Sequence, residues 1–443
     1  MPSSPNIESF LLSVLKEFEW YIREAGCWDS VTVQPTLTNP VLPMFQNRWA
    51  TGPNQHTRAV YSGLYPGLVL ASRLLSEDWP LLWFTKLTFS SRVASTTNPG
   101  QIHLAATSNS TPAAQIAQVK SNLAELGQVI TFLFAPRSCT DRAWGTTYNT
   151  KHAMRFHAEF RAADRPSIKP EFSTDAYRRR HQRPWVVMNP FFMDYFRARE
   201  AFCTPAETYR VQFLFAITLV HEVAHAYWFW LHERMPEPLW DASERNPELG
   251  FSWEREVIGR VVQPMLGYQG VDGIRTLISS ELREYRGSED RMEALVDMQH
   301  ATRLSRTLTR YGKKRRWPVL KPSELRGSEL FLENPGRKYL AGIQCIPMAW
   351  VSAWFQESEW VRRKGDWDRH NMYWPPALRD AFLVVYDQNG TTVQILRSLN
   401  VSIEGDKKIY KELQKEEKEM DARKKQREKD EEGIRKAFAK MNI

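Results

Sequence analysis

The most constraining feature of this chain is His221-Glu222-Val223-Ala224-His225, which places two histidines and a carboxylate on one short segment. On a helix, residues four apart lie on the same face, about one turn from each other. Both imidazole rings can then reach one metal ion, and Zn²⁺ is the ion typical of this spacing. The glutamate between them can take a proton from a water molecule that the metal makes acidic.

The residues before the motif predict where this helix begins. Thr204-Pro205-Ala206-Glu207 has the pattern of a capping box, with the threonine as N-cap, the proline at the first helical position and the glutamate at the third. The helix is expected to run to about His232 and to end at Glu233-Arg234-Met235-Pro236.

Two other interpretations of this segment have to be weighed. It could be a core helix whose histidines are satisfied by hydrogen bonds, or a membrane span, because residues 211–231 are nearly all apolar outside the motif. Burying two histidines and a glutamate without a partner is costly, which favours a metal site. No other segment has the composition of a span, so we expect a protein that does not cross a membrane.

A zinc ion held by two histidines needs another protein ligand and an open position for water. Asn246-Pro247 predicts the start of a second helix. Its buried face is marked by four apolar residues at helical spacing: Phe251, Ile258, Val261 and Val262.

Glu254 falls in the middle of that buried face, where an unpaired carboxylate would be costly. It is therefore the first candidate for the third ligand, and Glu248, at the helix start, is the second candidate. The alternative for Glu254 is a buried salt bridge, to Arg260 or Arg210.

With these residues the chain resembles the zincin metallopeptidases, and within them the gluzincin type, over about residues 150–265. In that group two histidines come from H-E-x-x-H and a glutamate comes from a following helix. The resemblance implies zinc bound by His221, His225 and Glu254, with Glu222 as the general base.

The chain departs from one branch of that group. Gluzincins of the thermolysin kind have Asn before the ligand glutamate and Asp four residues after it, whereas this chain has Trp253 and Ile258. The chain is also similar to uncharacterised H-E-x-x-H proteins that carry a downstream E-L-G-x-x-W-E element.

The expected fold class is α+β: a zincin-like core, formed by a short sheet and the active-site helix, embedded in a mostly helical protein. Residues 152–160 and 183–190 predict strands ahead of the helix. In the fold that the resemblance implies, an edge strand takes up the substrate backbone by β-addition, and we expect one of these two strands in that role.

Peptide hydrolysis also needs a donor that stabilises the oxyanion. Downstream of the predicted ligands the candidates are Tyr268, Tyr285 and His300, among which the sequence does not choose.

The main functional hypothesis is a zinc-dependent peptidase acting on a protein or peptide substrate. A catalytically inactive zincin-like binding domain is one alternative. A DNA-associated protease of the SprT-like kind is another, prompted by the net charge of +9, although the downstream histidine ligand of that family is missing.

Three regions are expected along the chain. Residues 1–130 predict a mostly helical region with loops, including a helix at 113–126; residues 131–400 predict the metallopeptidase domain with a helical C-terminal part; and residues 401–443 predict a charged helical tail, dense in Lys and Glu.

Charge and cysteine content add weaker indications. The basic runs at 313–316 and 178–183 are each more typical of a solvated loop, but the first could contact phosphate and the second could select acidic substrates. The four cysteines form no C-x-x-C pair, and the first residues have no basic and apolar signal segment. We therefore expect an intracellular protein, cytoplasmic or nuclear, with weak support for a nucleic-acid partner.

Overall fold

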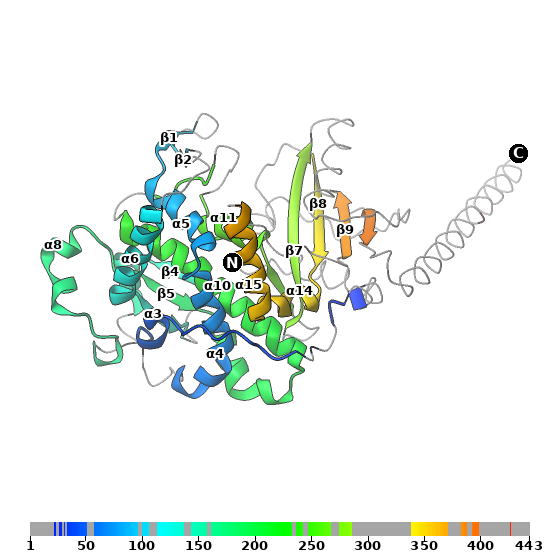
Figure 1. Ribbon diagram of the computed structural model, residues 1–443, viewed down its shortest axis with the longest axis horizontal. Coiled ribbons are helices and arrows are strands. Elements are labelled where there is room, and N and C mark those ends of the chain that lie inside the picture. Colours follow the sequence, from blue (N-terminus) through cyan, green and yellow to red (C-terminus); the bar gives the residue numbers. More distant parts are fainter. Residues whose placement is uncertain are drawn as a thin grey trace, which may run out of the picture.

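A computed structural model gives the architecture of the chain (Figure 1). It describes residues 22–285 with gaps at 24–25, 29–30, 32, 51–56, 96–99, 106–112, 137–142, 157–159, 161, 233–235, 242–246 and 267–273, and then residues 338–370, 382–387, 392–397 and 426. Within this part the fold is α+β, with small sheets among a larger number of helical residues, as predicted.

The helix that carries the motif, α10 (Pro205–Leu231), runs through the middle of the described structure (Figure 1). Thr204 is its N-cap, and the threonine hydroxyl accepts a hydrogen bond from the Glu207 amide at 3.2 Å. The helix ends at His232. Both predicted ends are confirmed, because a capping threonine, a proline at the first turn and a following polar segment are strong local signals.

Helix α10 is surrounded by protein on all sides. It contacts α4 (Thr57–Leu74), α11 (Leu249–Trp253), α14 (Met348–Ala353) and strands of two sheets. Its length and composition would suffice to cross a bilayer, but 83% of its most apolar window is buried inside the protein. That burial is typical of a core helix and is consistent with the prediction of no membrane span.

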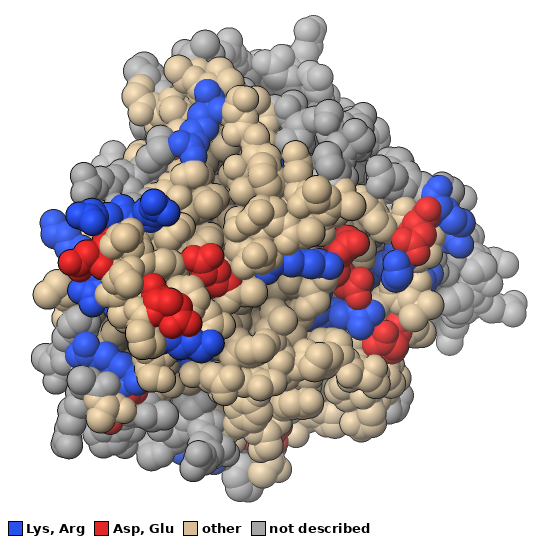
Figure 2. Space-filling view, turned by 60° about the vertical axis from the view of Figure 1, so that its left-hand side comes forward, with Lys and Arg blue, Asp and Glu red and all other residues tan. Residues whose placement is uncertain are grey.

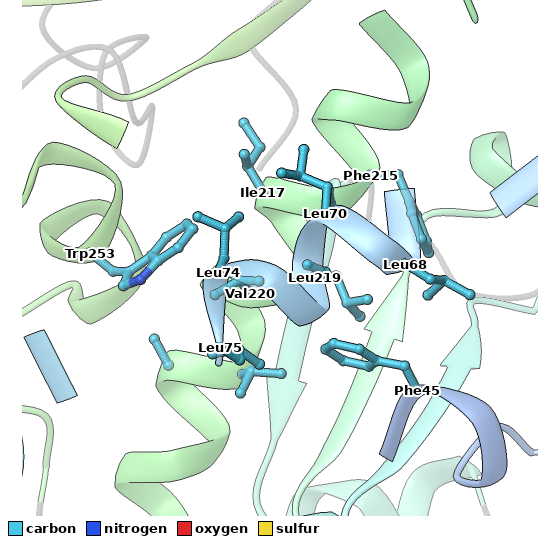
Figure 3. Close-up of a cluster of buried hydrophobic side chains, with 14 of the residues drawn as sticks. Phe45, Leu68, Leu70, Leu74, Leu75, Phe215, Ile217, Leu219, Val220 and Trp253 are labelled. Atoms are coloured by element: carbon cyan, nitrogen blue, oxygen red, sulfur yellow. The ribbon is translucent and has the colours of Figure 1, made fainter. Parts of the chain in front are cut away.

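Leucines of α4 and apolar residues of α10 form the centre of the core (Figure 3). Leu68, Leu70 and Leu74 of α4 are fully buried against Phe215 and Leu219 of α10. The same buried cluster also takes in Trp253 of α11 and Phe45 of the short helix α3 (Pro43–Asn47), so residues on both sides of position 130 share one core.

A three-stranded sheet packs against α10 and has the order β3-β5-β4. Strand β3 (Thr131–Phe134) runs parallel to β5 (Trp185–Met188), and β4 (Gly145–Tyr148) runs antiparallel to β5. The strand predicted at 183–190 is therefore confirmed as β5, and it is the central strand.

The strand predicted at 152–160 is wrong. Its described residues form α7 (Thr150–Ala153) and a 3-10 helix, Met154–Phe156. The Asn149 side chain caps α7 by accepting a hydrogen bond from the His152 amide. The buried residues Ala153, Phe156 and Phe160 are spaced by three and four, which is the period of a helix and not of a strand.

A second sheet of five antiparallel strands lies on the other side of α10 (Figure 1) and was not anticipated from the sequence. Its order is β10-β9-β8-β7-β6, with bounds β6 (Gln263–Leu266), β7 (Ile274–Tyr285), β8 (Lys338–Cys345), β9 (Phe382–Asp387) and β10 (Thr392–Arg397). The expected helical C-terminal part contains α14 and α15 (Glu357–His370) as well as this sheet.

The other elements are short or peripheral. They are α5 (Asp78–Phe89), the hairpin β1 (Arg92–Ala94) and β2 (Ile102–Leu104), α6 (Ala113–Val129), α8 (Asp175–Arg178) and α9 (Pro190–Asp194). The helix predicted at 113–126 is confirmed as α6. The predicted charged tail at 401–443 lies outside the described residues, apart from Gln426.

Candidate metal centre

His221, His225 and Glu248 come together and each offers a ligand atom, all within 4.8 Å of one another. One carboxylate oxygen of Glu248, Oε1, lies 2.7 Å from His225 Nε2 and 3.4 Å from His221 Nε2. The two histidines are one turn apart on α10, so their Nε2 atoms face the same point. This is the only such group of three among the residues that the structure describes.

Glu248 is held in place by the helix that it begins. As the N-cap of α11, it accepts a hydrogen bond from the Phe251 amide through Oε2 at 2.6 Å. Its other oxygen, Oε1, is thereby directed at the two histidines. The predicted helix start at Asn246-Pro247 is slightly displaced, because the capping residue is Glu248.

Glu254 occupies a different position from the one predicted for the third ligand. Its Oε1 lies 2.8 Å from His221 Nδ1, on the opposite side of the ring from Glu248, and its Oε2 accepts the Val262 amide at 2.8 Å. Both oxygens of this buried carboxylate therefore contact groups other than the Nε2 atoms that face Glu248. The geometry therefore favours the second candidate, Glu248, as the third ligand.

The alternative salt bridges of Glu254 are not formed either. Arg210 donates to the Ile274 carbonyl, and Arg260 donates to the Gln344 side chain. Glu254 begins a π-helical turn that ends at Gly259, whose φ of 83° is the left-handed conformation that glycine adopts readily. This turn brings the amide of Val262 back to the Glu254 carboxylate.

The second histidine has the same kind of partner, which sequence analysis missed. Glu237 Oε1 lies 2.6 Å from His225 Nδ1. The segment around Glu237 is held by backbone hydrogen bonds of Leu239 with β2, to the Ile102 carbonyl at 2.8 Å and from the Leu104 amide at 3.0 Å. The available signal was a carboxylate between two prolines shortly after the end of α10.

Each histidine therefore has a carboxylate at Nδ1 and presents Nε2 to Glu248. A carboxylate at Nδ1 fixes the proton on that nitrogen, orients the ring and makes Nε2 a stronger metal ligand. Glu254 and Glu237 perform this role in parallel, from two different segments that follow α10.

Two glycines leave the room that this arrangement needs. A Cβ on Gly250 of α11 would overlap the His221 ring, and a Cβ on Gly145 of β4 would lie 2.6 Å from Glu222 Cγ. Distances below 3.0 Å are not tolerated by real Cβ atoms, so larger residues at these positions would displace the ring or the carboxylate.

Glu222 is buried beside the ligand atoms, with Oε1 4.0 Å from His221 Nε2. The Thr147 hydroxyl of β4 lies 2.7 Å from Glu222 Oε2 and 2.9 Å from the Glu222 carbonyl oxygen. Burial raises the pKa of the Glu222 carboxyl, and the two histidines and the Thr147 hydrogen bond oppose that rise.

The three candidate ligands are electrostatically coupled. Burial by itself lowers the pKa of His221 and His225, but the carboxylates of Glu248, Glu254 and Glu237 outweigh it and raise both values well above the ordinary range. Burial would raise the pKa of Glu248, but the two histidines hold it well below the ordinary range. Because the ligands of a metal ion have to be deprotonated, metal binding by these groups would be coupled to proton release.

A cavity of about 260 Å³ opens onto these groups. Its walls come from the edge strand β4 with the two residues before it, from α10, from α11 and from the start of β6. The apolar lining consists of Ala143, Trp144, Leu214, Phe229, Phe251 and Val262. The cavity therefore combines a few convergent polar groups with apolar walls, as ligand sites in proteins do.

The donor set fits zinc. Two imidazole nitrogens and a carboxylate oxygen are ligands of catalytic zinc sites, and atoms bonded at 2.0–2.1 Å in a tetrahedron lie about 3.3 Å apart. The separation of 3.4 Å between His221 Nε2 and Glu248 Oε1 agrees with this value, and the separation of 2.7 Å to His225 Nε2 would have to open slightly. The cavity leaves space beside these atoms for a further ligand such as water.

The side chains of the three predicted oxyanion donors lie outside the described structure, so their role stays a prediction. Tyr268 and His300 lie outside the described residues, and Tyr285 is the last residue of β7, with only its backbone described. The uncharged polar side chains that do line the cavity are Thr146, Thr147, Thr218 and Gln263.

Comparison with known proteins finds no matching family model, no matching curated protein and no matching solved structure.

Zinc affinity can separate the role of Glu248, the N-cap of α11, from that of Glu254 in the π-helical turn that follows α11. We expect Glu248→Gln to weaken zinc binding more than about 100-fold, because the substitution removes the negative charge of a zinc ligand. Glu254→Gln should weaken zinc binding about 10- to 100-fold, because Glu254 only orients the ring of the ligand His221. Competition with a chromophoric chelator measures both values. Glu256→Gln, at an exposed residue of the same turn, is the matched control. A larger loss in Glu254→Gln than in Glu248→Gln would contradict the assignment.

Proposed function

We propose that the protein is a zinc-dependent metallopeptidase with a zincin-like core, in which Glu222 is the general base. The observation that carries the proposal is the convergence of His221, His225 and Glu248 next to the buried carboxylate of Glu222, in a cavity. Two nitrogen ligands, one oxygen ligand and an adjacent base are the requirements of metal-assisted hydrolysis.

The neighbouring edge strand supports a peptide as the substrate. Strand β4 lies at the end of the three-stranded sheet and lines the cavity along residues 145–147. An extended peptide can add to such an edge through backbone hydrogen bonds, which would place its carbonyl groups over the site. This role was predicted for residues 152–160 or 183–190, but the first of these is helical and β5 in the second is paired on both sides.

A zinc ion bound by the three ligands would make a water molecule acidic and would polarise the substrate carbonyl group. Glu222 would orient that water molecule, accept its proton on the carboxylate and deliver the proton to the leaving nitrogen. Thr147 would hold the carboxylate in position, and Glu254 and Glu237 would hold the two imidazole rings.

The two alternatives from the sequence differ from this proposal in what they require. A zincin-like binding domain would keep the metal ligands without needing Glu222, and a DNA-associated protease of the SprT-like kind would need salt-dependent DNA binding. Among the described residues no observation favours either alternative over the peptidase.

Glu222→Gln separates an enzyme from a binding domain. We expect the variant to lose peptidase activity by at least about 1000-fold, because the amide cannot accept the proton, while zinc content stays near one per chain. Activity on a denatured protein substrate and metal content by mass spectrometry are the two measurements. A zinc-loaded wild-type protein that cleaves nothing, or a variant that is as active as wild type, would contradict the proposal.

Thr147 offers a finer test of the same chemistry. Thr147→Val keeps the shape of the side chain and removes the hydroxyl, so we expect kcat to fall about tenfold while KM and zinc affinity change little. Thr147→Ser, which keeps the hydroxyl, should retain most of the activity. An unchanged kcat in the valine variant would show that the hydrogen bond to Glu222 has no role in turnover.

A further inference from the structure

An arginine-rich segment is built onto the elements that form the metal centre. Arg178, Arg179 and Arg180 close helix α8 and the turn that follows it, and all three side chains are exposed. None of them makes an ion pair within the described part of the chain. Three neighbouring positive charges without ion pairs in the described structure are available to bind a negatively charged group.

The backbone of this segment is fixed to α10. Tyr177 accepts a hydrogen bond from Trp230 Nε1 at 2.9 Å through its hydroxyl group. His181 stacks on the Trp230 ring, with centroids 4.6 Å apart, and its Nδ1 lies 3.0 Å from the Trp230 carbonyl oxygen. The three arginines lie between these two anchors, so their position relative to α10 is set.

The same segment is also joined to the end of β4. Gln182 Oε1 accepts the Thr150 amide at 3.2 Å, and the Thr150 hydroxyl accepts the Arg183 amide at 2.8 Å. Tyr148, the last residue of β4, pairs with Trp185. Arg180 is five residues along the chain from Trp185 and Arg178 is seven, and seven residues of chain span at most about 25 Å. The arginines therefore lie within that reach of the end of the edge strand.

The charge around this segment is positive overall. Between residues 150 and 183 the described side chains include seven Lys or Arg and three Asp or Glu. Lys151 and Lys169 are exposed as well, and Glu171 and Asp175 are the exposed carboxylates. Figure 2 brings forward the side of the molecule that carries α8 in Figure 1, and it shows several Lys and Arg side chains at its left with Asp and Glu side chains among them.

We propose that Arg178, Arg179 and Arg180 bind acidic residues of the substrate, on the N-terminal side of the bond to be cleaved. The proposal rests on the proposed function, because it takes β4 as the strand that receives the substrate. Gly145 and Thr147 lie against Glu222, whereas Tyr148, the last residue of β4, is not part of the cavity wall. A substrate strand antiparallel to β4 therefore carries its N-terminal part past Tyr148, the end of β4 to which the arginine segment is joined through Thr150.

The reach of the arginines sets the position of the acidic residues. An extended strand rises about 3.3 Å per residue, so a distance of up to about 25 Å corresponds to at most about seven residues beyond the end of β4. The arginines would therefore select for negative charge remote from the reacting carbonyl. The apolar walls of the cavity would receive the residues next to it.

Peptide binding tests this inference without requiring turnover. The zinc-loaded full chain with Glu222→Gln is titrated against three fluorescein-labelled peptides that share a central sequence. The first carries a run of Glu in its N-terminal half, the second carries the run in its C-terminal half, and the third has Gln at all of these positions. We expect the first peptide to bind about tenfold more tightly than the other two at low salt, since several surface charge pairs act together. The difference should shrink as salt is added.

Substitution of the arginines then tests whether they cause the preference for the first peptide. Arg178→Ser, Arg179→Ser and Arg180→Ser combined should abolish the preference, and the corresponding three Lys substitutions should keep most of it. The matched control is the triple Ser substitution of Arg362, Lys364 and Arg369, three exposed cations of α15 that are already ion-paired. Because the three arginines are exposed and form no ion pair in the described structure, the thermal unfolding temperature of their Ser variant should change little, and it serves as the folding check.

The opposing results are distinct. Equal binding of the three peptides, or an unchanged preference in the Ser variant, would overturn the inference. Tighter binding of a single-stranded oligonucleotide, lost in the same variant, would overturn it in favour of a nucleic-acid site. A wild-type protein that binds zinc and cleaves no substrate would instead be a failure of the proposed function, and the peptide titration reports independently of that result.

Discussion

The structure depends on the burial of two histidines and a glutamate on one face of α10. Each of these groups would be costly in a protein interior without a partner. Glu254 and Glu237 bind the Nδ1 atoms of the histidines, and Glu248 lies between the two Nε2 atoms. The Thr147 hydroxyl binds the carboxylate of Glu222. The polar groups therefore satisfy one another, and the point on which they converge offers a cation two nitrogen atoms and one oxygen atom.

The surrounding fold serves to bring these partners to α10. The helix is packed against α4, both sheets, α11 and α14, so its own position is fixed by apolar burial on every side. The partners then come from short segments with special backbone geometry: the N-cap of α11, a π-helical turn closed by Gly259, and a segment joined to β2. Such local irregularities are common where a side chain has to be aimed at a functional site.

Local signals predicted much of this arrangement, and long-range contacts account for what was missed. The motif, the cap at Thr204 and strand β5 were readable because each depends on residues close together in the sequence. The burial of Glu254 was predicted, but its partner was not, since whether a buried carboxylate meets a metal or a ring nitrogen depends on a displacement of a few ångströms. Glu237 and the five-stranded sheet depend on contacts between distant segments, and β4 is too short to stand out from its sequence.

These contacts predict that one cation is held by His221, His225 and Glu248, with Glu254 outside the ligand set. A crystal structure of the zinc-loaded protein, with anomalous diffraction recorded at the zinc edge, tests it most directly. The predicted result is one peak about 2.0–2.2 Å from the two Nε2 atoms and from Glu248, with Glu254 still bonded to His221 Nδ1. A zinc ion coordinated by Glu254 in place of Glu248, or a folded protein in zinc that shows no peak between the histidines, would contradict it.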